Sequence, residues 1–141
     1  MHILSFVIFI LFALLAAFLV FNYPKEKKTT PIEDSDKIKV LNDHNFDHQI
    51  KRGIILVDFW APWCMPCKTM APVLNSLSEE LDGNAAVAKL NVDIQQSITL
   101  RYGVKKIPTM VLFKNGEEIN RYTGFRTKDF LLKEIAKVKQ V

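Results

Sequence analysis

The sequence predicts an α/β domain, a mixed central sheet flanked by helices, preceded by one N-terminal transmembrane helix. Two observations carry this prediction. Residues 3–21 form a 19-residue stretch in which Ser5 is the single polar side chain. Beyond it, β-prone runs alternate with helical patterns in the order β-α-β-α-β-α-β-β-α. The helical crossovers imply parallel strands and the one direct hairpin implies an antiparallel strand, so the sheet is mixed.

The apolar N-terminal stretch has the length of a membrane-spanning helix. At about 1.5 Å per residue, a helix of this length comes close to the roughly 30 Å hydrocarbon layer. Tyr23 follows where an interfacial aromatic belongs, and Pro24 ends the helix. The competing interpretation is a cleaved signal peptide, with the small residues Ala16 and Ala17 near a cut site. We favour the anchor, because no Lys or Arg precedes the stretch and the apolar run continues beyond Ala17.

Composition divides the chain into an anchor over residues 1–23, a linker over 24–35 and a globular domain over 36–141. The linker combines three Lys with two Glu and one Asp and holds few apolar groups. The domain carries the whole positive excess, with 16 Lys and Arg against 12 Asp and Glu, and no basic block. Nucleic acid is therefore not an expected partner.

The domain begins with a strand, a short helix and a second strand. Residues 37–41 alternate like an edge strand. Asn42 or Asp43 can cap a short helix, which Gly53 closes. Residues 54–60 form a continuous β-prone run, the pattern of a central strand that is covered on both faces.

A long helix opens the middle of the domain, over residues from about 64 to 81. Pro72 lies in its interior, where a kink is expected. Residues 85–91 then predict another strand, and residues 97–102 predict a brief helix that Gly103 ends.

The last part of the domain predicts a hairpin and a helix. Residues 109–114 form a core strand, and the Asn115-Gly116 turn leads into a strand over 118–123. Both turn residues accept the positive φ that a type I′ turn requires. Thr127 can cap the final helix.

The chemistry lies at the join between the central strand and the long helix, where the only two cysteines occur. Cys64 and Cys67 are too few for a disulfide scaffold and must be explained as a pair. Residues three apart in the first helical turn have Cα atoms roughly 5 to 6 Å apart, which a disulfide tolerates. The helix N-terminus favours a thiolate at Cys64, so Cys64 is the expected nucleophile and Cys67 the resolving thiol. Pro66 fits a first turn, because its missing N–H has no intrahelical acceptor there.

The sequence resembles thioredoxin over essentially all of residues 36–141. The matching segments are Val57-Asp58-Phe59-Trp60-Ala61, Trp63-Cys64-Met65-Pro66-Cys67-Lys68, Ala71-Pro72, Lys89-Leu90-Asn91-Val92-Asp93, Ile107-Pro108-Thr109, Phe113-Lys114-Asn115-Gly116 and Gly124. A bare C-x-x-C is a weak signal, but here it stands between a strand and a helix with the other segments in order downstream. Met65 departs from the pattern, because thioredoxins proper usually have Gly there. The residues between the cysteines tune redox poise, so reductant and oxidant roles both stay open.

The resemblance implies an acid-base group beneath the cysteines. Asp58 would be buried there with a raised pKa and would exchange a proton with Cys67, with Lys89 as its charge partner. The residues alone also allow a strand-end Asp58 that faces water.

The resemblance further implies a substrate-binding surface. Pro108 would be cis, and with the backbone of Ile107 it would shape the surface for a substrate chain. Trp63 and Gly124 would offer further contacts to a partner protein. The active-site loop is completed by Trp60, Met65 and Pro66.

The expected function is thiol-disulfide exchange on protein substrates through the Cys64–Cys67 dithiol, as part of electron transport and redox homeostasis. No organic cofactor or metal is expected, because the cysteine pair is the redox group. One alternative is a redox-inactive binding subunit of a membrane complex. Another is a zinc site formed by the cysteines with His44 and His48, which is disfavoured because a core strand separates the two pairs and Pro66 interrupts the knuckle.

The expected partners are disulfide-containing proteins, an electron donor that is either similar to thioredoxin reductase or a membrane electron carrier, and lipid around residues 3–21. The chain is expected to be a monomer. The lysines that follow the span favour a cytoplasmic domain by the positive-inside rule, whereas anchored members of the family often face the oxidising side. Both orientations stay open. The lysines concerned are Lys25, Lys27 and Lys28.

Overall fold

The structure is a computed structural model that describes residues 2–22, 33–81, 83 and 85–140. It divides into two compact units, residues 1–31 and 32–141. In the first unit, helix α1 (His2–Phe21) exposes its apolar side chains and is long and apolar enough to cross a membrane. The predicted boundary residues Tyr23 and Pro24, the three lysines after them and most of the linker lie outside the described residues.

The second unit is built on a sheet whose strands lie in the order β1-β3-β2-β4-β5 within the described ranges. β2 pairs parallel with β3 and antiparallel with β4, which confirms the mixed sheet. β1 pairs parallel with β3 at the edge, and β5 forms the hairpin with β4. The strands are β1 (Lys39–Val40), β2 (Ile54–Trp60), β3 (Ala85–Asn91), β4 (Thr109–Lys114) and β5 (Glu117–Thr123).

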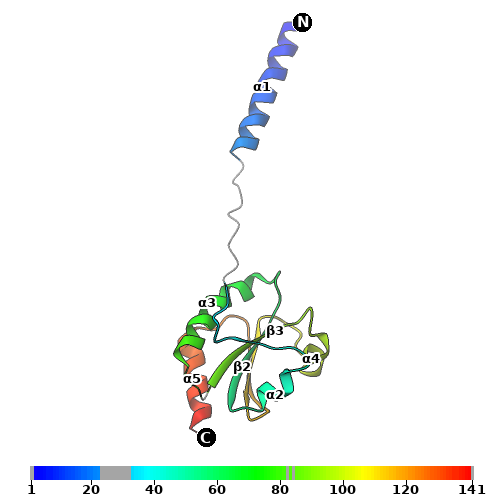
Figure 1. Ribbon diagram of the computed structural model, residues 1–141. Coiled ribbons are helices and arrows are strands. Elements are labelled where there is room, and N and C mark those ends of the chain that lie inside the picture. Colours follow the sequence, from blue (N-terminus) through cyan, green and yellow to red (C-terminus); the bar gives the residue numbers. More distant parts are fainter. Residues whose placement is uncertain (1, 23–32, 82, 84, 141) are drawn as a thin grey trace. The chain divides into compact units, whose positions relative to one another are not determined.

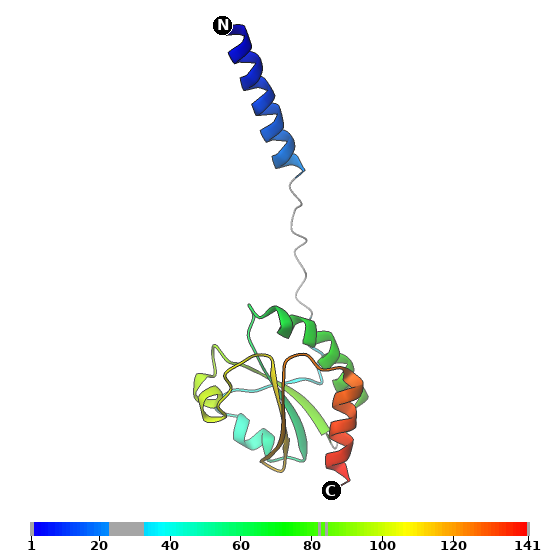
Figure 2. The same cartoon turned by 180° about the vertical axis from the view of Figure 1, so that it is seen from behind.

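Helices cover both faces of this sheet. Two of them, α3 and α5, lie on one face, and α2 and α4 lie on the other (Figure 1), as the view from behind confirms (Figure 2). The helices are α2 (Phe46–Ile50), α3 (Met65–Glu80), α4 (Gln96–Arg101) and α5 (Lys128–Lys139). Pro72 lies inside α3, as predicted.

Each face has its own hydrophobic core, because side chains alternate between the faces along a strand. Leu56 of β2 packs with Met70 and Leu74 of α3 on one side. Phe59 of β2 packs with Phe46 and Phe113 on the other side. β2 is therefore buried on both faces along nearly its whole length, as its continuous β-prone run predicts.

Turns and caps follow the sequence signals, with two differences. Asn115 and Gly116 have φ values of 52° and 94°, as a type I′ turn requires, and the Thr127 hydroxyl accepts a hydrogen bond from Phe130 N at the start of α5. The first strand is shorter than the predicted 37–41. Asn42 caps the turn before α2 through His44 N and Asn45 N, so the helix begins later than an Asn42 cap would place it.

Candidate active site

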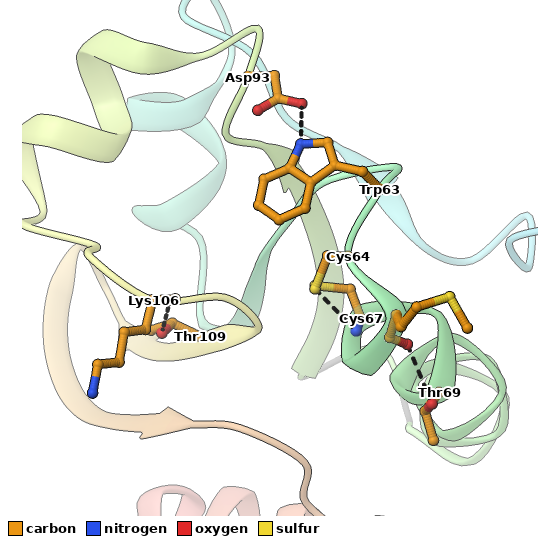
Figure 3. The surroundings of a disulfide bond; sticks show 8 residues. Trp63, Cys64, Cys67, Thr69, Asp93, Lys106 and Thr109 are labelled. Carbon is orange, nitrogen blue, oxygen red and sulfur yellow. Dashed lines mark hydrogen bonds between the residues drawn. A yellow bond between two sulfur atoms is a disulfide. The ribbon is translucent and has the colours of Figure 1, made fainter.

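The two cysteines form a disulfide at the N-terminus of α3 (Figure 3). Their Cα atoms are 5.3 Å apart, within the range predicted from helical spacing. Cys64 is the N-cap residue, and its Sγ accepts a hydrogen bond from the backbone N–H of Cys67 at 3.2 Å. The Cys67 N–H and the positive end of the α3 dipole thus lie at the sulfur of Cys64. After reduction, the same groups stabilise a thiolate there.

Burial distinguishes the cysteines from the residues around them but not from each other. Cys64 and Cys67 are both 4% exposed in the disulfide form. Met65, between them, is 67% exposed, and Pro66 is exposed beside it in the first turn.

Aromatic and aliphatic side chains surround the cysteine pair. Trp60, at the end of β2, and Ile107 pack against the small buried cluster that contains the disulfide. Trp63 instead projects outward, 67% exposed, and its indole N–H donates to Asp93 Oδ2 at 3.0 Å (Figure 3). This bond fixes the orientation of a large apolar surface beside Cys64, where the sequence predicts contact with a partner protein.

Two further predicted binding residues meet through the backbone. The Ile107–Pro108 bond is cis, as the resemblance implies. The carbonyl of Pro108 accepts a hydrogen bond from Gly124 N at 2.8 Å, and Gly124 has a φ of 82° that favours glycine. Ile107 packs against the buried cluster of Ala61, Cys64 and Cys67, so this backbone pair lies next to the cluster that holds the cysteines.

Asp58 lies on β2 under the helix that carries Cys67. Alternation along β2 places Asp58 on the same face as Leu56, the face that α3 and α5 cover. Its side chain is 1% exposed, and neither carboxylate oxygen has a hydrogen-bond partner among the described residues. Burial raises the pKa of Asp58 to about 7, against a smaller lowering effect of the Lys89 charge. The alternative of a strand-end Asp58 that faces water is therefore wrong.

Lys89 lies beside Asp58 as predicted, but its ammonium bonds another carboxylate. The two residues are register partners on adjacent parallel strands. Lys89 Nζ is 2.7 Å from Asp34 Oδ1 and 3.0 Å from Asp34 Oδ2, and it lies 4.3 Å from the centroid of the Trp60 ring. The charge of Lys89 acts on the carboxyl of Asp58, as expected, but the direct ion pair of Lys89 is with Asp34, and Asp58 has no hydrogen-bond partner among the described residues.

Two residues near the site were missed from sequence. The sequence places Asp34 in the predicted linker and Asp93 in a segment that matches thioredoxin, and it indicates a role for neither. A lysine in a buried strand requires an anion nearby. The sequence already offers Asp58 as that anion for Lys89, so no second acidic residue is sought. The three acidic residues Glu33, Asp34 and Asp36 before the first strand were the remaining candidates.

The histidines of the zinc hypothesis lie apart from this site. His48 is exposed on α2 and its Nε2 contacts Arg52 Nη2 at 2.8 Å, and His44 is exposed in the turn before that helix. In the part of the chain that the structure describes, no three His, Cys, Asp or Glu side chains gather as metal ligands would. The two cysteines form a disulfide with each other. A Cys₂His₂ zinc site needs both of them as thiolates, so this disulfide excludes such a site.

Comparison with known proteins gives one consistent family. The thioredoxin family model matches residues 37–137. The thioredoxin of Staphylococcus saprophyticus subsp. saprophyticus is 45% identical over 97 residues, 69% of this chain and 93% of that protein. Thioredoxin of Staphylococcus aureus is 41% identical over the same shares. Among solved structures, a mutant thioredoxin from Halobacterium salinarum NRC-1 superposes with a TM-score of 0.67 at 34% identity, over 74% of this chain and 93% of that one.

Proposed function

The chain belongs to the thioredoxin family and is a thiol-disulfide oxidoreductase, and from this premise we propose that it reduces disulfides of protein substrates through Cys64 and Cys67. One observation carries the proposal. The cysteines form a disulfide in the first turn of α3, and Cys64 Sγ accepts the Cys67 N–H. A sulfur held in this way is stabilised as a thiolate, the form that attacks disulfides.

In the first step, the reduced Cys64 thiolate attacks one sulfur of a substrate disulfide. A bond forms between Cys64 Sγ and that sulfur, the substrate S–S bond breaks, and the second substrate sulfur leaves as a thiolate that takes up a proton. The Cys67 N–H and the N-terminus of α3 stabilise the attacking thiolate.

In the second step, Cys67 resolves the mixed disulfide. Asp58 accepts the Cys67 proton, and the resulting thiolate attacks Cys64 Sγ, which re-forms the Cys64–Cys67 disulfide and expels the first substrate sulfur. Two electrons pass from the dithiol to the substrate. Burial brings the pKa of Asp58 to about 7, within roughly two units of an ordinary thiol at about 8.5, so proton transfer is less uphill than to an ordinary carboxylate. Lys89 tunes this carboxyl through its charge.

We assign substrate binding to the surface beside the disulfide. Trp63 offers an exposed indole, and Ile107 with Pro108 offers a backbone edge that Gly124 supports. An extended polypeptide segment fits such a surface, because its backbone groups can bond the backbone edge and its apolar side chains can pack on the indole. Regeneration of the dithiol needs a reductase or another electron donor, as in the family generally.

We also propose that residues 1–23 anchor the chain in a membrane, with 24–35 as the linker and 36–141 as the catalytic domain. The apolar helix α1 supports this proposal. An anchored chain stays in the membrane fraction after carbonate washing and keeps its N-terminus, whereas a cleaved one is released and shortened. Labelling of reduced Cys64 in intact cells with a membrane-impermeant maleimide places the domain outside, and protection of Cys64 places it inside.

The test of the function is insulin reduction by the full-length protein in detergent, with dithiothreitol as electron donor. Wild type accelerates the reaction, Cys64→Ser abolishes the acceleration, and Cys67→Ser accumulates mixed disulfides that identify the substrates. Thr69→Ala, an exposed change on the same helix, keeps the activity. Activity that survives Cys64→Ser, or a reduction potential outside the range of about −270 to −120 mV of exchange-competent dithiols, favours the redox-inactive binding subunit.

A further inference from the structure

The ammonium of Lys89 is held by a carboxylate that lies outside the strands and helices. Lys89 is 7% exposed on β3, and both oxygens of Asp34 bond its Nζ. We propose that Asp34 is a positioning residue for the dithiol reaction: it withholds the Lys89 ammonium from Asp58 and so sets the pH at which Asp58 exchanges a proton with Cys67. This inference rests on the role proposed above for Asp58.

The segment around Asp34 is fastened to the helix that carries Cys67. Ser35 N donates to Asn75 Oδ1 at 2.9 Å, and Asn75 Nδ2 donates to the carbonyl of Glu33 at 2.9 Å. The Ser35 hydroxyl also bonds Glu79 of the same helix. The residues on both sides of Asp34 are thus fixed on α3, and the carboxylate between them is directed at Lys89. A loose chain segment would not hold a two-oxygen contact in this way, because fixing it costs conformational entropy.

The position of the Lys89 ammonium determines how strongly its positive charge acts on the carboxyl of Asp58. Lys89 is the register partner of Asp58, so a free ammonium there would be the nearest cation for that buried carboxylate. The Lys89 ammonium instead contacts the Asp34 carboxylate and the Trp60 ring, whose centroid is 4.3 Å from Nζ. Asp58 keeps no hydrogen-bond partner among the described residues.

The charged groups that act on Asp58 come from two elements. Lys89 of β3 lowers the pKa of Asp58, and Asp34 of the 33–35 segment raises it, in addition to the larger effect of burial. Cys67 of α3 carries no charge in the disulfide. Both effects of Asp34 have the same sign, because its charge repels a second carboxylate and its contact with Lys89 neutralises the cation.

Asp34 lies outside the part of the chain that the family match describes. The family model covers residues 37–137, so this contact is supplied by the segment that precedes the matched region. The proton-accepting group of the domain is therefore tuned by the chain that leads to α1.

The test is the pKa of Asp58, measured by carboxyl-carbon NMR titration of the oxidised full-length protein in detergent micelles. Asp34→Asn removes the charge and keeps the shape, and it lowers the pKa of Asp58 by about one unit, the effect of an unneutralised cation nearby. The low-pH limb of the pH profile of insulin reduction moves to lower pH by the same amount. Asp34→Glu restores most of the shift. Asp36→Asn, an exposed change of equal charge two residues away, leaves the pKa in place.

A second pair of variants tests whether the effect runs through Lys89. In a Lys89→Met background, Asp34→Asn shifts the pKa of Asp58 clearly less than in wild type. An equal shift in that background, no shift in Asp34→Asn, or the same shift in Asp36→Asn each overturns the inference. Asp34→Ser replaces Asp34→Asn if the latter does not fold. The titration measures the pKa of Asp58 directly, so it gives an answer even if the wild type fails to reduce insulin and the proposed function is wrong.

Discussion

The two faces of the sheet bury different kinds of side chain. Under α2 and α4, aromatic rings close the core, with Phe113 in T-shaped contact with Phe46 and Tyr102 at centroid distances of 6.0 and 5.4 Å. Under α3 and α5, the core cluster is also apolar, but strand alternation places the buried Asp58 and Lys89 on the same face. The groups that are costly to bury lie on the face whose helix carries the cysteines. The aromatic face stabilises the fold, whereas on the other face burial of the Asp58 carboxyl costs stability, which we relate to the proton-transfer role proposed above.

The largest expected effect is on the aromatic face. Phe113→Ala removes a fully buried ring and leaves a cavity, so the unfolding free energy falls by about 3 to 5 kcal/mol. The reduction potential and the pKa of Asp58 stay unchanged, because the ring lies on the opposite side of the sheet. Chemical denaturation and a redox titration measure both.

Phe125→Ala is the matched control, since Phe125 is an exposed phenylalanine and its truncation costs far less. A change in the reduction potential of the Phe113→Ala variant would show that the two faces are coupled and that the division drawn above is wrong.

The second effect is the cost of burying Asp58. Its pKa is raised from 3.8 to about 7, so between these values the native state keeps a proton that the unfolded state has released. The unfolding free energy of wild type therefore falls as pH rises through this window, by roughly 2 kcal/mol between about pH 5 and about pH 7, and the cost is fully present above pH 7. Asp58→Asn removes this dependence.

Denaturation of the oxidised protein across this pH range measures the difference between wild type and Asp58→Asn. Asp36→Asn, which changes an exposed carboxylate, should follow the wild-type curve. Parallel curves for wild type and Asp58→Asn would mean that Asp58 is ionised throughout and that its burial is offset by a partner.

The two faces also differ in how well the sequence predicts them. Strands β2, β3 and β4 were predicted with their observed bounds, because long β-prone runs and a turn of Asn115 and Gly116 leave few alternatives. The cysteine geometry followed from helical spacing alone. These features depend on residues that are close together in the chain.

The electrostatic partner of Lys89 could not be predicted in this way. Asp34 is 55 residues away in sequence and belongs to a stretch with no periodic pattern. Its position depends on Asn75, whose amide bonds the backbone on both sides of it. Local patterns carry no information about such a contact, so the sequence favours Asp58, the acidic residue in the adjacent strand, over the acidic residues that precede the first strand.

The third effect separates packing from charge on the α3 and α5 face. Thr127→Ala removes the hydroxyl that caps α5 and should lower the unfolding free energy by about 1 kcal/mol. The pKa of Asp58 stays in place, because the Thr127 hydroxyl carries no charge and its hydrogen bond is with Phe130 N. Thermal denaturation and the NMR titration measure the two quantities.

Thr69→Ala, the same change at an exposed position inside α3, serves as the control and costs little or nothing. If Thr127→Ala moves the pKa of Asp58, the position of α5 contributes to the setting of that carboxyl, and the effect assigned to Asp34 is shared.

The smallest effect concerns an ion pair on the aromatic face, which is exposed to solvent, unlike the ion pair of Asp34 with the buried Lys89. Arg101 Nη2 of α4 is 3.0 Å from Asp47 Oδ1 of α2, and the two side chains are 48% and 57% exposed. Water screens such a pair, so Asp47→Asn lowers the unfolding free energy by less than about 1 kcal/mol, and the difference from wild type shrinks in high salt. Denaturation at low and high salt measures the difference in unfolding free energy.

Arg101 also stacks over the rings of Phe46 and Tyr102. If the guanidinium contributes through these ring contacts rather than through the ion pair, Arg101→Met should lower the unfolding free energy more than Asp47→Asn. Equal costs for the two variants would assign its contribution to the ion pair instead.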